Sequence, residues 1–129
     1  MLADRGRADV EVRSGGIAPY ARDTSLVSLD ARFVLRDYGV EIPAETTSCD
    51  LKRHAEHFVW ADLIVAMTEE QKQMLAAFPE AAQTRAVTLR EFAGGAGDID
   101  DPAGRGAEFY SARGDEIRQC LEQVLERFA

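Results

Sequence analysis

An uninterrupted apolar run that leads directly into a helix start constrains this chain more than any other stretch. Every residue of Leu63–Met67 is apolar, and Thr68 follows at once. A strand without alternation is typical of a parallel sheet covered by helices on both faces. Thr68 and Gln71 have the spacing of a capping box, which predicts a helix N-terminus. In open α/β sheets this carboxyl end of a strand is where ligands bind, although an ordinary core βα unit without a site explains the same residues.

The other apolar patterns predict helices and strands in alternation. The expected order is a strand at 10–13, a helix over 25–38, a short helix over 51–58, the central strand, a helix over 69–78, a strand at 85–89 and a helix over 107–128. Alternation of this kind predicts an α/β fold, a three-layer arrangement with an open parallel sheet flanked by helices. A length of 129 residues predicts a single domain over 1–129.

Two of the predicted helices carry expectations about packing. Leu26, Leu29 and Phe33 widen the apolar face of the helix over 25–38, so we expect that helix to be well buried. The last helix is expected to bury an apolar stripe made of Phe109, Ile117, Cys120, Leu121, Val124 and Phe128. It also contains Gly114, which costs about 1 kcal/mol relative to alanine in a helix interior.

Charge and cysteine content limit the classes of partner and compartment. The net charge is −8, with 23 acidic against 15 basic side chains, which argues against nucleic acid and anionic membranes as partners. No apolar run approaches the roughly 18 residues of a membrane span, and the charged amino terminus is unlike a signal peptide. Two isolated cysteines, Cys49 and Cys120, favour a reducing cytoplasmic location over a disulfide framework.

Two small motifs favour ordinary structural roles. His54 and His57 lie three residues apart, with no cysteine, aspartate or third histidine in register, so we interpret them as solvated or capping groups and predict no metal site. Ser14-Gly-Gly16 is interpreted as a plain turn after the first strand, although its glycines would also suit an anion.

The loop after the last predicted strand concentrates carboxylates. Asp98, Asp100 and Asp101 fall within four residues, behind a glycine-rich stretch and before Pro102. A carboxylate over the carboxyl edge of a sheet can act as a general acid or ligate a hard cation. An acidic turn before a helix N-terminus explains the same residues.

Several segments, taken together, resemble one family along nearly the whole chain. The matching stretches are Val12-Arg-Ser-Gly-Gly16, Trp60–Thr68, Phe78-Pro79, Thr88–Ala93 and Asp98-Ile-Asp-Asp-Pro102. They are similar to the strand-two turn, third segment, fourth strand and general-acid loop of the low-molecular-weight protein-tyrosine phosphatases, which include bacterial protein-arginine phosphatases. By this resemblance Asp101 would protonate the leaving group, and no cofactor or metal is implied.

The chain departs from that family at the nucleophile. The family uses a cysteine that opens a Cys-x5-Arg loop at the end of its first strand, but Ala55 stands six residues after Cys49 and Glu126 six after Cys120. We therefore interpret both cysteines as bystanders. By resemblance, the first strand, the phosphate loop and most of the first helix, about 25 residues, are expected to be missing. Ala103 also stands where the family usually has an aromatic residue that contacts a planar substrate.

The resemblance implies hydrolysis of phosphotyrosine or phosphoarginine in a phosphorylated protein, through a phosphocysteine intermediate. We expect the chain as written to lack this activity. The preferred interpretation is a phosphatase in which Met1 is an internal start, because residues 1–6 resemble the end of a helix cut in mid-course. A non-catalytic module that binds a partner and a relative of arsenate reductase remain as alternatives, although the two cysteines are not spaced for the latter.

A missing first strand would also affect association. In the family this strand lies between the strands that correspond to 10–13 and 63–67. Its loss would expose unpaired backbone edges. We expect either self-association through these edges or direct pairing of the two strands.

Overall fold

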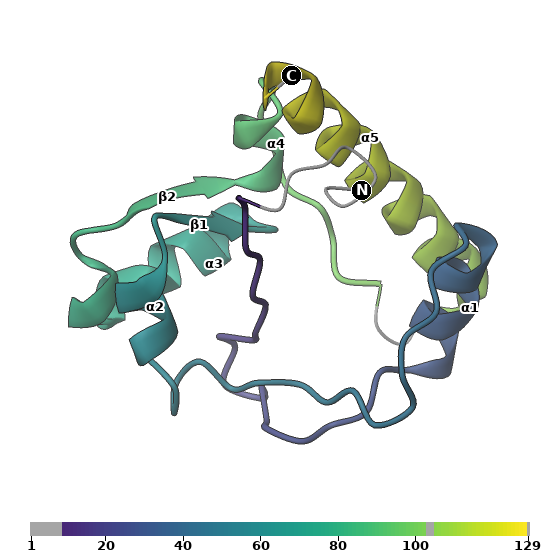
Figure 1. The fold of residues 1–129 in the computed structure, drawn as a ribbon, viewed down its shortest axis with the longest axis horizontal. Coiled ribbons are helices and arrows are strands. Elements are labelled where there is room, and N and C mark those ends of the chain that lie inside the picture. The colour runs from purple at the N-terminus through teal and green to yellow at the C-terminus, as the bar shows by residue number, and fades with distance from the viewer. Residues whose placement is uncertain (1–8, 103–104, 129) are drawn as a thin grey trace.

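The computed structural model describes residues 9–102 and 105–128 and has an α/β architecture with helices flanking a parallel sheet (Figure 1). The elements are α1 (Leu29–Asp37), α2 (Glu56–Trp60), β1 (Leu63–Ala66), α3 (Glu69–Met74), β2 (Arg85–Thr88), α4 (Leu89–Phe92) and α5 (Ala107–Phe128). Short 3-10 helices at Leu75–Ala77 and Pro79–Ala81 follow α3. The predicted fold class is therefore confirmed.

The sheet of the described residues consists of β1 and β2, paired in parallel from Leu63 opposite Arg85 to Ala66 opposite Thr88. Both strands were predicted from sequence, and each ends one residue earlier than expected. Parallel pairing brings their two carboxyl ends to the same edge of the sheet. Helices α3 and α4 begin at that edge and pack against both strands.

Each strand is followed directly by a helix whose N-cap is a threonine. Thr68 Oγ1 accepts a hydrogen bond from the Gln71 amide at 3.1 Å. The Gln71 side chain accepts from the amide of Met67 at 3.1 Å, one residue before the cap itself, so the predicted capping box is present in a shifted form. A complete capping box joins Thr88 and Glu91 at the start of α4. The resemblance had placed Thr88–Ala93 in a strand, which is wrong after Thr88 because the cap starts a helix there.

In the part of the chain that the structure describes, buried apolar side chains gather in two clusters. One gathers Phe58, Leu75 and Ala81 on the α2 side of the sheet. The other gathers Leu89, Ile99 and Cys120 between α4 and α5. The predicted inner stripe of the last helix is confirmed at Cys120 and Val124, which are 5% exposed.

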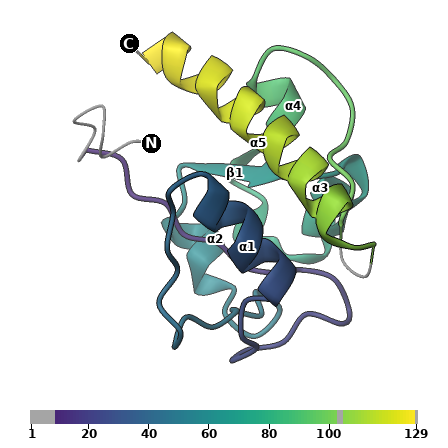
Figure 2. The same cartoon turned by 90° about the vertical axis from the view of Figure 1, so that its right-hand side faces the viewer.

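Helix α1 packs against α5 (Figure 2), and Figure 1 shows it on the opposite side of the molecule from β1 and β2. Gly114 makes this close approach possible, because a Cβ there would lie 2.9 Å from Val34 Cγ1 and 3.2 Å from Tyr38 Oη. The hydroxyl of Tyr38 donates to the Asp115 carboxylate beside this contact. The glycine that weakens the isolated helix is thus required by the packing of α1.

The predicted helix over 25–38 was wrong at its start and in its burial. It begins at Leu29, with Ser28 as N-cap, because Ser25 and Leu26 pair with Ser48 and Thr47 of a connector instead. A large part of the expected apolar face is exposed: Leu26 is 66%, Leu29 72% and Phe33 57% accessible. The short helix expected at 51–58 is likewise displaced, to Glu56–Trp60.

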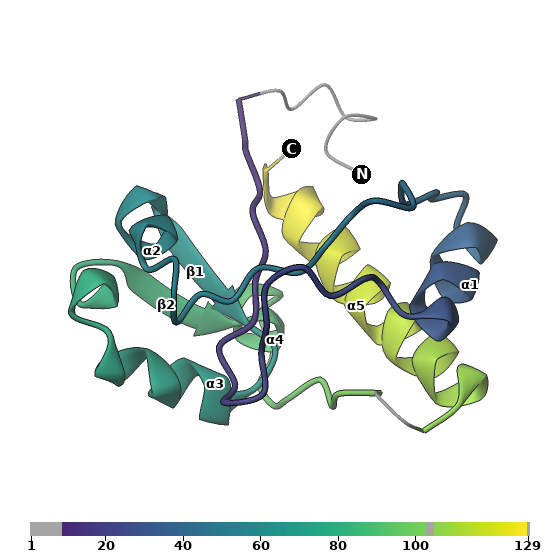
Figure 3. The ribbon, with the colours of Figure 1, turned by 90° about the horizontal axis from the view of Figure 1, so that it is seen from below.

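The predicted strand at 10–13 is absent, and this segment forms no ladder with β1 among the described residues, so the predicted direct pairing is also wrong. Arg13 instead lies 3.7 Å from the Trp60 ring centre. Farther on, Gly16 forms a parallel bridge with Asp50, and the segments around residues 16–26 and 47–50 run side by side (Figure 3). At Gly15 a Cβ would lie 2.7 Å from the Leu51 side chain, so the Gly15–Gly16 pair serves close packing.

Across the described residues, no helix combines the length and the apolar character needed to cross a membrane.

We predict that Gly114→Ala destabilises the protein although alanine favours helices. Overpacking against Val34 costs about 1–3 kcal/mol and outweighs a gain of about 1 kcal/mol in helix propensity. Urea unfolding should show a net loss on the order of 1 kcal/mol. The double variant with Val34→Ala removes the clashing methyl groups, so a favourable coupling energy is expected in the mutant cycle; additive effects would contradict this origin of the cost.

A second prediction concerns the ion pair between α3 and α4. Lys72 Nζ lies 2.9 Å from Glu91 Oε1, and this contact, with the Thr88 amide, lowers the pKa of Glu91 from 4.5 to about 2. A carboxyl whose pKa falls on folding stabilises the fold above its unfolded pKa, and the contribution is lost as the pH falls. Glu91→Gln removes the negative charge and keeps an oxygen that can accept the capping hydrogen bond. The substitution should therefore lower the unfolding free energy at pH 7. The difference in unfolding free energy between variant and parent should shrink below about pH 4.5. Exposed Glu70 on α3 provides the control, since Glu70→Gln should show no such trend.

Candidate active site and side-chain cluster

The aspartate-rich loop is fixed over the carboxyl end of β1 by backbone contacts. The Ile99 amide donates to the carbonyl of Met67, directly after the strand, at 2.9 Å. Asp98 Oδ1 accepts from the Glu69 amide at 2.8 Å, which satisfies a free N–H at the start of α3. The Ile99 side chain is only 3% exposed and packs with Leu89 in the core. The loop is therefore held at the predicted edge of the sheet.

The next two carboxylates of the loop face solvent and have different neighbours. Asp100 Oδ2 lies 3.9 Å from Arg113 Nη1 on α5. The hydroxyl of Tyr20 donates to Asp101 Oδ2 at 3.5 Å, across 81 positions of sequence. Asp98 is occupied as a helix cap, Asp100 is paired with an arginine, and Asp101 meets a neutral hydroxyl. The loop thus presents two carboxylates at this edge, and Asp101 lies beside Tyr20 of a distant segment.

The segment that carries Tyr20 also carries Asp23, and it is tied to the neighbouring connector. Lys52 Nζ donates to the carbonyls of Ala18 and Ala21 at 2.5 and 3.3 Å. The Asp50 amide donates to Asp23 Oδ1 at 2.7 Å. One segment thus contacts the acid loop through Tyr20 and a second group of side chains through Asp23.

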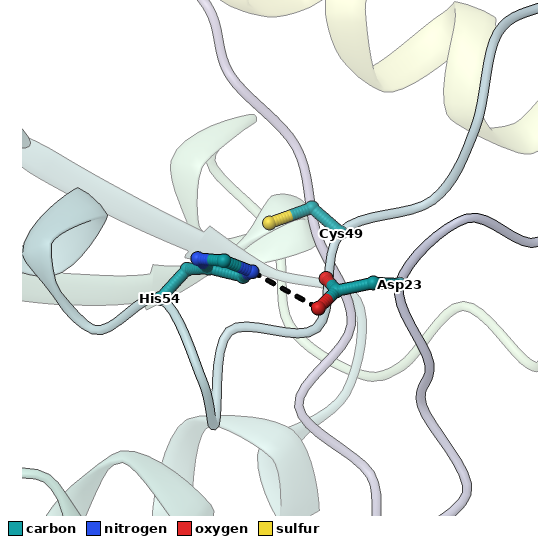
Figure 4. Close-up of side chains that lie close together, drawn as sticks. All are labelled: Asp23, Cys49 and His54. Carbon is teal, nitrogen blue, oxygen red and sulfur yellow. Dashed lines mark hydrogen bonds and ion pairs between the residues drawn. The ribbon is translucent and has the colours of Figure 1, made fainter.

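This second group consists of Asp23, Cys49 and His54, which we call the Asp23 cluster (Figure 4). His54 Nε2 and Asp23 Oδ2 are 3.0 Å apart. One ligand atom from each of the three residues lies within 4.8 Å of the other two. Figure 4 shows the Cys49 sulfur and the Asp23 carboxylate directed towards the imidazole ring.

Charge sets the protonation behaviour of the cluster. The hydrogen bond from the Asp50 amide, together with that from His54, lowers the pKa of Asp23. The bond to Asp23 in turn raises the pKa of His54. Desolvation, followed by the charges of Asp23, Glu56 and Asp50, raises the pKa of the Cys49 thiol. At neutral pH the sulfur is therefore a protonated thiol, which is a weak nucleophile.

The interpretation of His54 as a solvated or capping group is incomplete: its side chain is 41% exposed, but tertiary contacts also supply the aspartate and the cysteine that local spacing lacked. Asp23 comes from a turn and Cys49 from a connector, and no periodic pattern relates the two positions to His54. His57 fits the expectation better, since its Nδ1 lies only near the exposed Arg13 guanidinium, at 3.4 Å. Cys120 is buried in the core, as predicted.

Known proteins resemble this chain over almost all of it. Residues 1–129 match the family model for low molecular weight phosphotyrosine protein phosphatases. A protein-arginine-phosphatase of Geobacillus stearothermophilus is 36% identical over 129 residues, covering 98% of this chain and 82% of the relative. A protein-arginine-phosphatase of Bacillus subtilis is 34% identical over 68 residues, covering 52% of this chain and 45% of that relative.

Solved structures agree with the sequence matches. The arginine phosphatase structure from Geobacillus stearothermophilus superposes with a TM-score of 0.84, covering 98% of this chain and 79% of that one. A low molecular weight protein tyrosine phosphatase from T. tengcongensis superposes with a TM-score of 0.83 at 27% identity, covering 98% of this chain and 82% of that one. With the fold, the anchored Asp-Pro loop and the family model in agreement, the chain belongs to the low molecular weight phosphotyrosine protein phosphatase family.

Proposed function

We propose that this chain supplies the general-acid side of a phosphatase site for phosphorylated proteins, with Asp101 as the acid. The observation that carries the proposal is the anchoring of the loop at residues 98–102 over the carboxyl end of β1, through Ile99 and Asp98. Ligands bind at this edge in open α/β sheets. Pro102 supports the assignment, because it restricts the residue before it to extended geometry and so limits where the Asp101 carboxylate points.

Phosphoarginine is the favoured substrate class. The relative with 36% identity over 98% of this chain is a protein-arginine-phosphatase, whereas the tyrosine phosphatase structure is 27% identical. The residue after Pro102 is Ala103, which has no ring to stack on a phenol. Cleavage of a phosphorus–nitrogen bond requires a proton on the leaving nitrogen, and Asp101 would supply it.

Phosphoryl transfer itself needs a nucleophile that we do not assign to either cysteine. Neither Cys49 nor Cys120 begins a Cys-x5-Arg sequence in the 129 residues. The pKa of the Cys49 thiol is raised by burial and by nearby carboxylates, whereas a phosphatase nucleophile needs a thiolate stabilised by an anion-binding loop. We therefore propose that turnover requires the family's cysteine loop in addition to these residues.

We predict that the 129-residue chain hydrolyses p-nitrophenyl phosphate and phosphoarginine no faster than buffer. Its physical reason is the absence of an activated thiolate. Phosphate release should be measured with and without a chelator, for the parent, Cys49→Ser and Cys120→Ser. Chelator-resistant turnover that disappears in Cys49→Ser would show that the Asp23 cluster supplies the nucleophile.

A further prediction concerns a phosphatase site that is completed by adding the missing elements as a separate fragment. When a fragment with the first strand, cysteine loop and first helix of the Geobacillus stearothermophilus relative is added, phosphatase activity should appear. A general acid contributes about 10²–10⁴-fold, so Asp101→Asn should lower kcat by about that factor for phosphoarginine or an alkyl phosphate. The loss should be smaller for p-nitrophenyl phosphate, because nitrophenolate leaves without much protonation.

Asp100→Asn is the matched control, since it changes the adjacent carboxylate while Asp101 remains. It should cost much less than Asp101→Asn. Equal losses, or a reversed order, would overturn the assignment to Asp101. Reconstitution that restores binding of a phosphorylated peptide but no turnover would instead favour a non-catalytic module, the second candidate that the lack of a Cys-x5-Arg sequence supports.

A further inference from the structure

The Asp23 cluster brings together three residue types that bind transition metals. Zinc in proteins is held by cysteine sulfur, histidine nitrogen and carboxylate oxygen, and sites that retain an open position use three protein ligands. Asp23, Cys49 and His54 offer one atom of each kind, mutually within 4.8 Å. Around a tetrahedral zinc ion, neighbouring ligand atoms lie about 3.4–3.7 Å apart, given bond lengths of about 2.0–2.3 Å. Side-chain movements of about 1 Å therefore suffice to close the site.

The groups behind these ligands are also placed as they are in metal sites. The Asp50 amide holds Asp23 Oδ1 at 2.7 Å, which leaves Oδ2 facing His54 Nε2. The other imidazole nitrogen, Nδ1, lies 3.6 Å from Glu56 Oε1. A carboxylate behind a ligating histidine orients the ring and raises its basicity. Asp23 thus has one oxygen held from behind by a hydrogen bond, and His54 has a carboxylate near the ring nitrogen that faces away from the cluster.

The local charge favours a divalent cation over an anion. Asp23, Asp50 and Glu56 act on the thiol as negative charges. Of the cations, Lys52 is bound to Asp50 at 3.0 Å and to two backbone carbonyls, and Arg53 acts on Asp23. The side chains of His54 and Asp23 are 41% and 26% exposed, so a metal ion can enter and a water molecule can complete its coordination. An excess of negative charge that repels phosphate is well suited to zinc.

We propose that Asp23 Oδ2, Cys49 Sγ and His54 Nε2 form a zinc-binding site with a fourth position open to water. On binding, Cys49 loses its thiol proton to solvent and His54 coordinates as neutral imidazole. The ion replaces the hydrogen bond between Asp23 and His54 and ties the turn at 23 to the connector at 49 and to residue 54. These segments contain no strand ladder or long helix. A bound metal ion would therefore stabilise a part of the described fold that has little regular secondary structure.

The test uses the full chain, stripped of metal with a chelator and kept in a reductant that does not bind metal. Zinc at 100-fold excess over its Kd should raise Tm by roughly 5 °C or more. Cobalt(II) should bind one ion per chain and produce a thiolate-to-cobalt charge-transfer band with tetrahedral visible absorption. Cys49→Ser, Asp23→Asn and His54→Gln should each abolish the Tm shift, and Cys49→Ser should also remove the charge-transfer band. Glu56→Gln should weaken zinc binding by about 10–100-fold.

Two control variants separate this site from nonspecific binding. His57→Gln removes a neighbouring histidine, and Cys120→Ser removes the other thiol. Both should keep the zinc-dependent Tm shift and the cobalt band, each variant being compared with its own metal-free form. If Cys49→Ser fails to fold, the cobalt spectrum of Cys120→Ser identifies the sulfur ligand, because Cys49 is then the sole thiol of the chain. An unchanged Tm together with no charge-transfer band, or signals that survive in Cys49→Ser, would overturn the proposal.

Discussion

The parallel pairing of β1 with β2 is the constraint on which the candidate active site depends. It aligns Ala66 with Thr88, so both strands end at one edge of the sheet, and each strand is followed there by a helix. The hydrogen bond from Ile99 to Met67 then returns the aspartate-rich loop to that same edge. Burial of Ile99 against Leu89 holds the loop in place from the opposite side. A backbone ladder, one cap and one apolar anchor together hold the loop that carries Asp101 at this edge.

The second part of the molecule is organised by side chains and single bridges. The segments around residues 16–26 and 47–50 meet through isolated backbone pairs, at Gly16 with Asp50 and at Leu26 with Thr47. Lys52 and Asp23 fasten them through hydrogen bonds to the backbone. Such contacts constrain the chain less than a ladder does, because each can open without breaking its neighbours. The Asp23 cluster lies at the point where these two segments and the start of α2 converge.

Glycines illustrate how local preference gives way to packing. Gly114 lies inside a helix of 22 residues, where its propensity is poor, and the close approach of Val34 and Tyr38 explains its presence. Gly15 lies in what sequence indicated to be a turn after a strand, yet the space it leaves is filled by the Leu51 side chain. In both cases the missing Cβ is explained by a residue far away in the chain. Sequence alone reveals the glycine and leaves its neighbour unknown.

The sequence by itself determined those features that depend on neighbouring residues. The unbroken apolar run at Leu63–Met67 identified β1, the Thr68 cap identified the start of α3, and the stripe with Cys120 and Val124 identified α5. Periodicity and capping are local properties, which is why sequence reveals them. Only the tertiary structure decided that residues 10–13 form no strand and that much of the apolar face of α1 is exposed. It also decided that His54 has an aspartate and a cysteine beside it. These outcomes depend on which distant segments pair, and no local pattern encodes that choice.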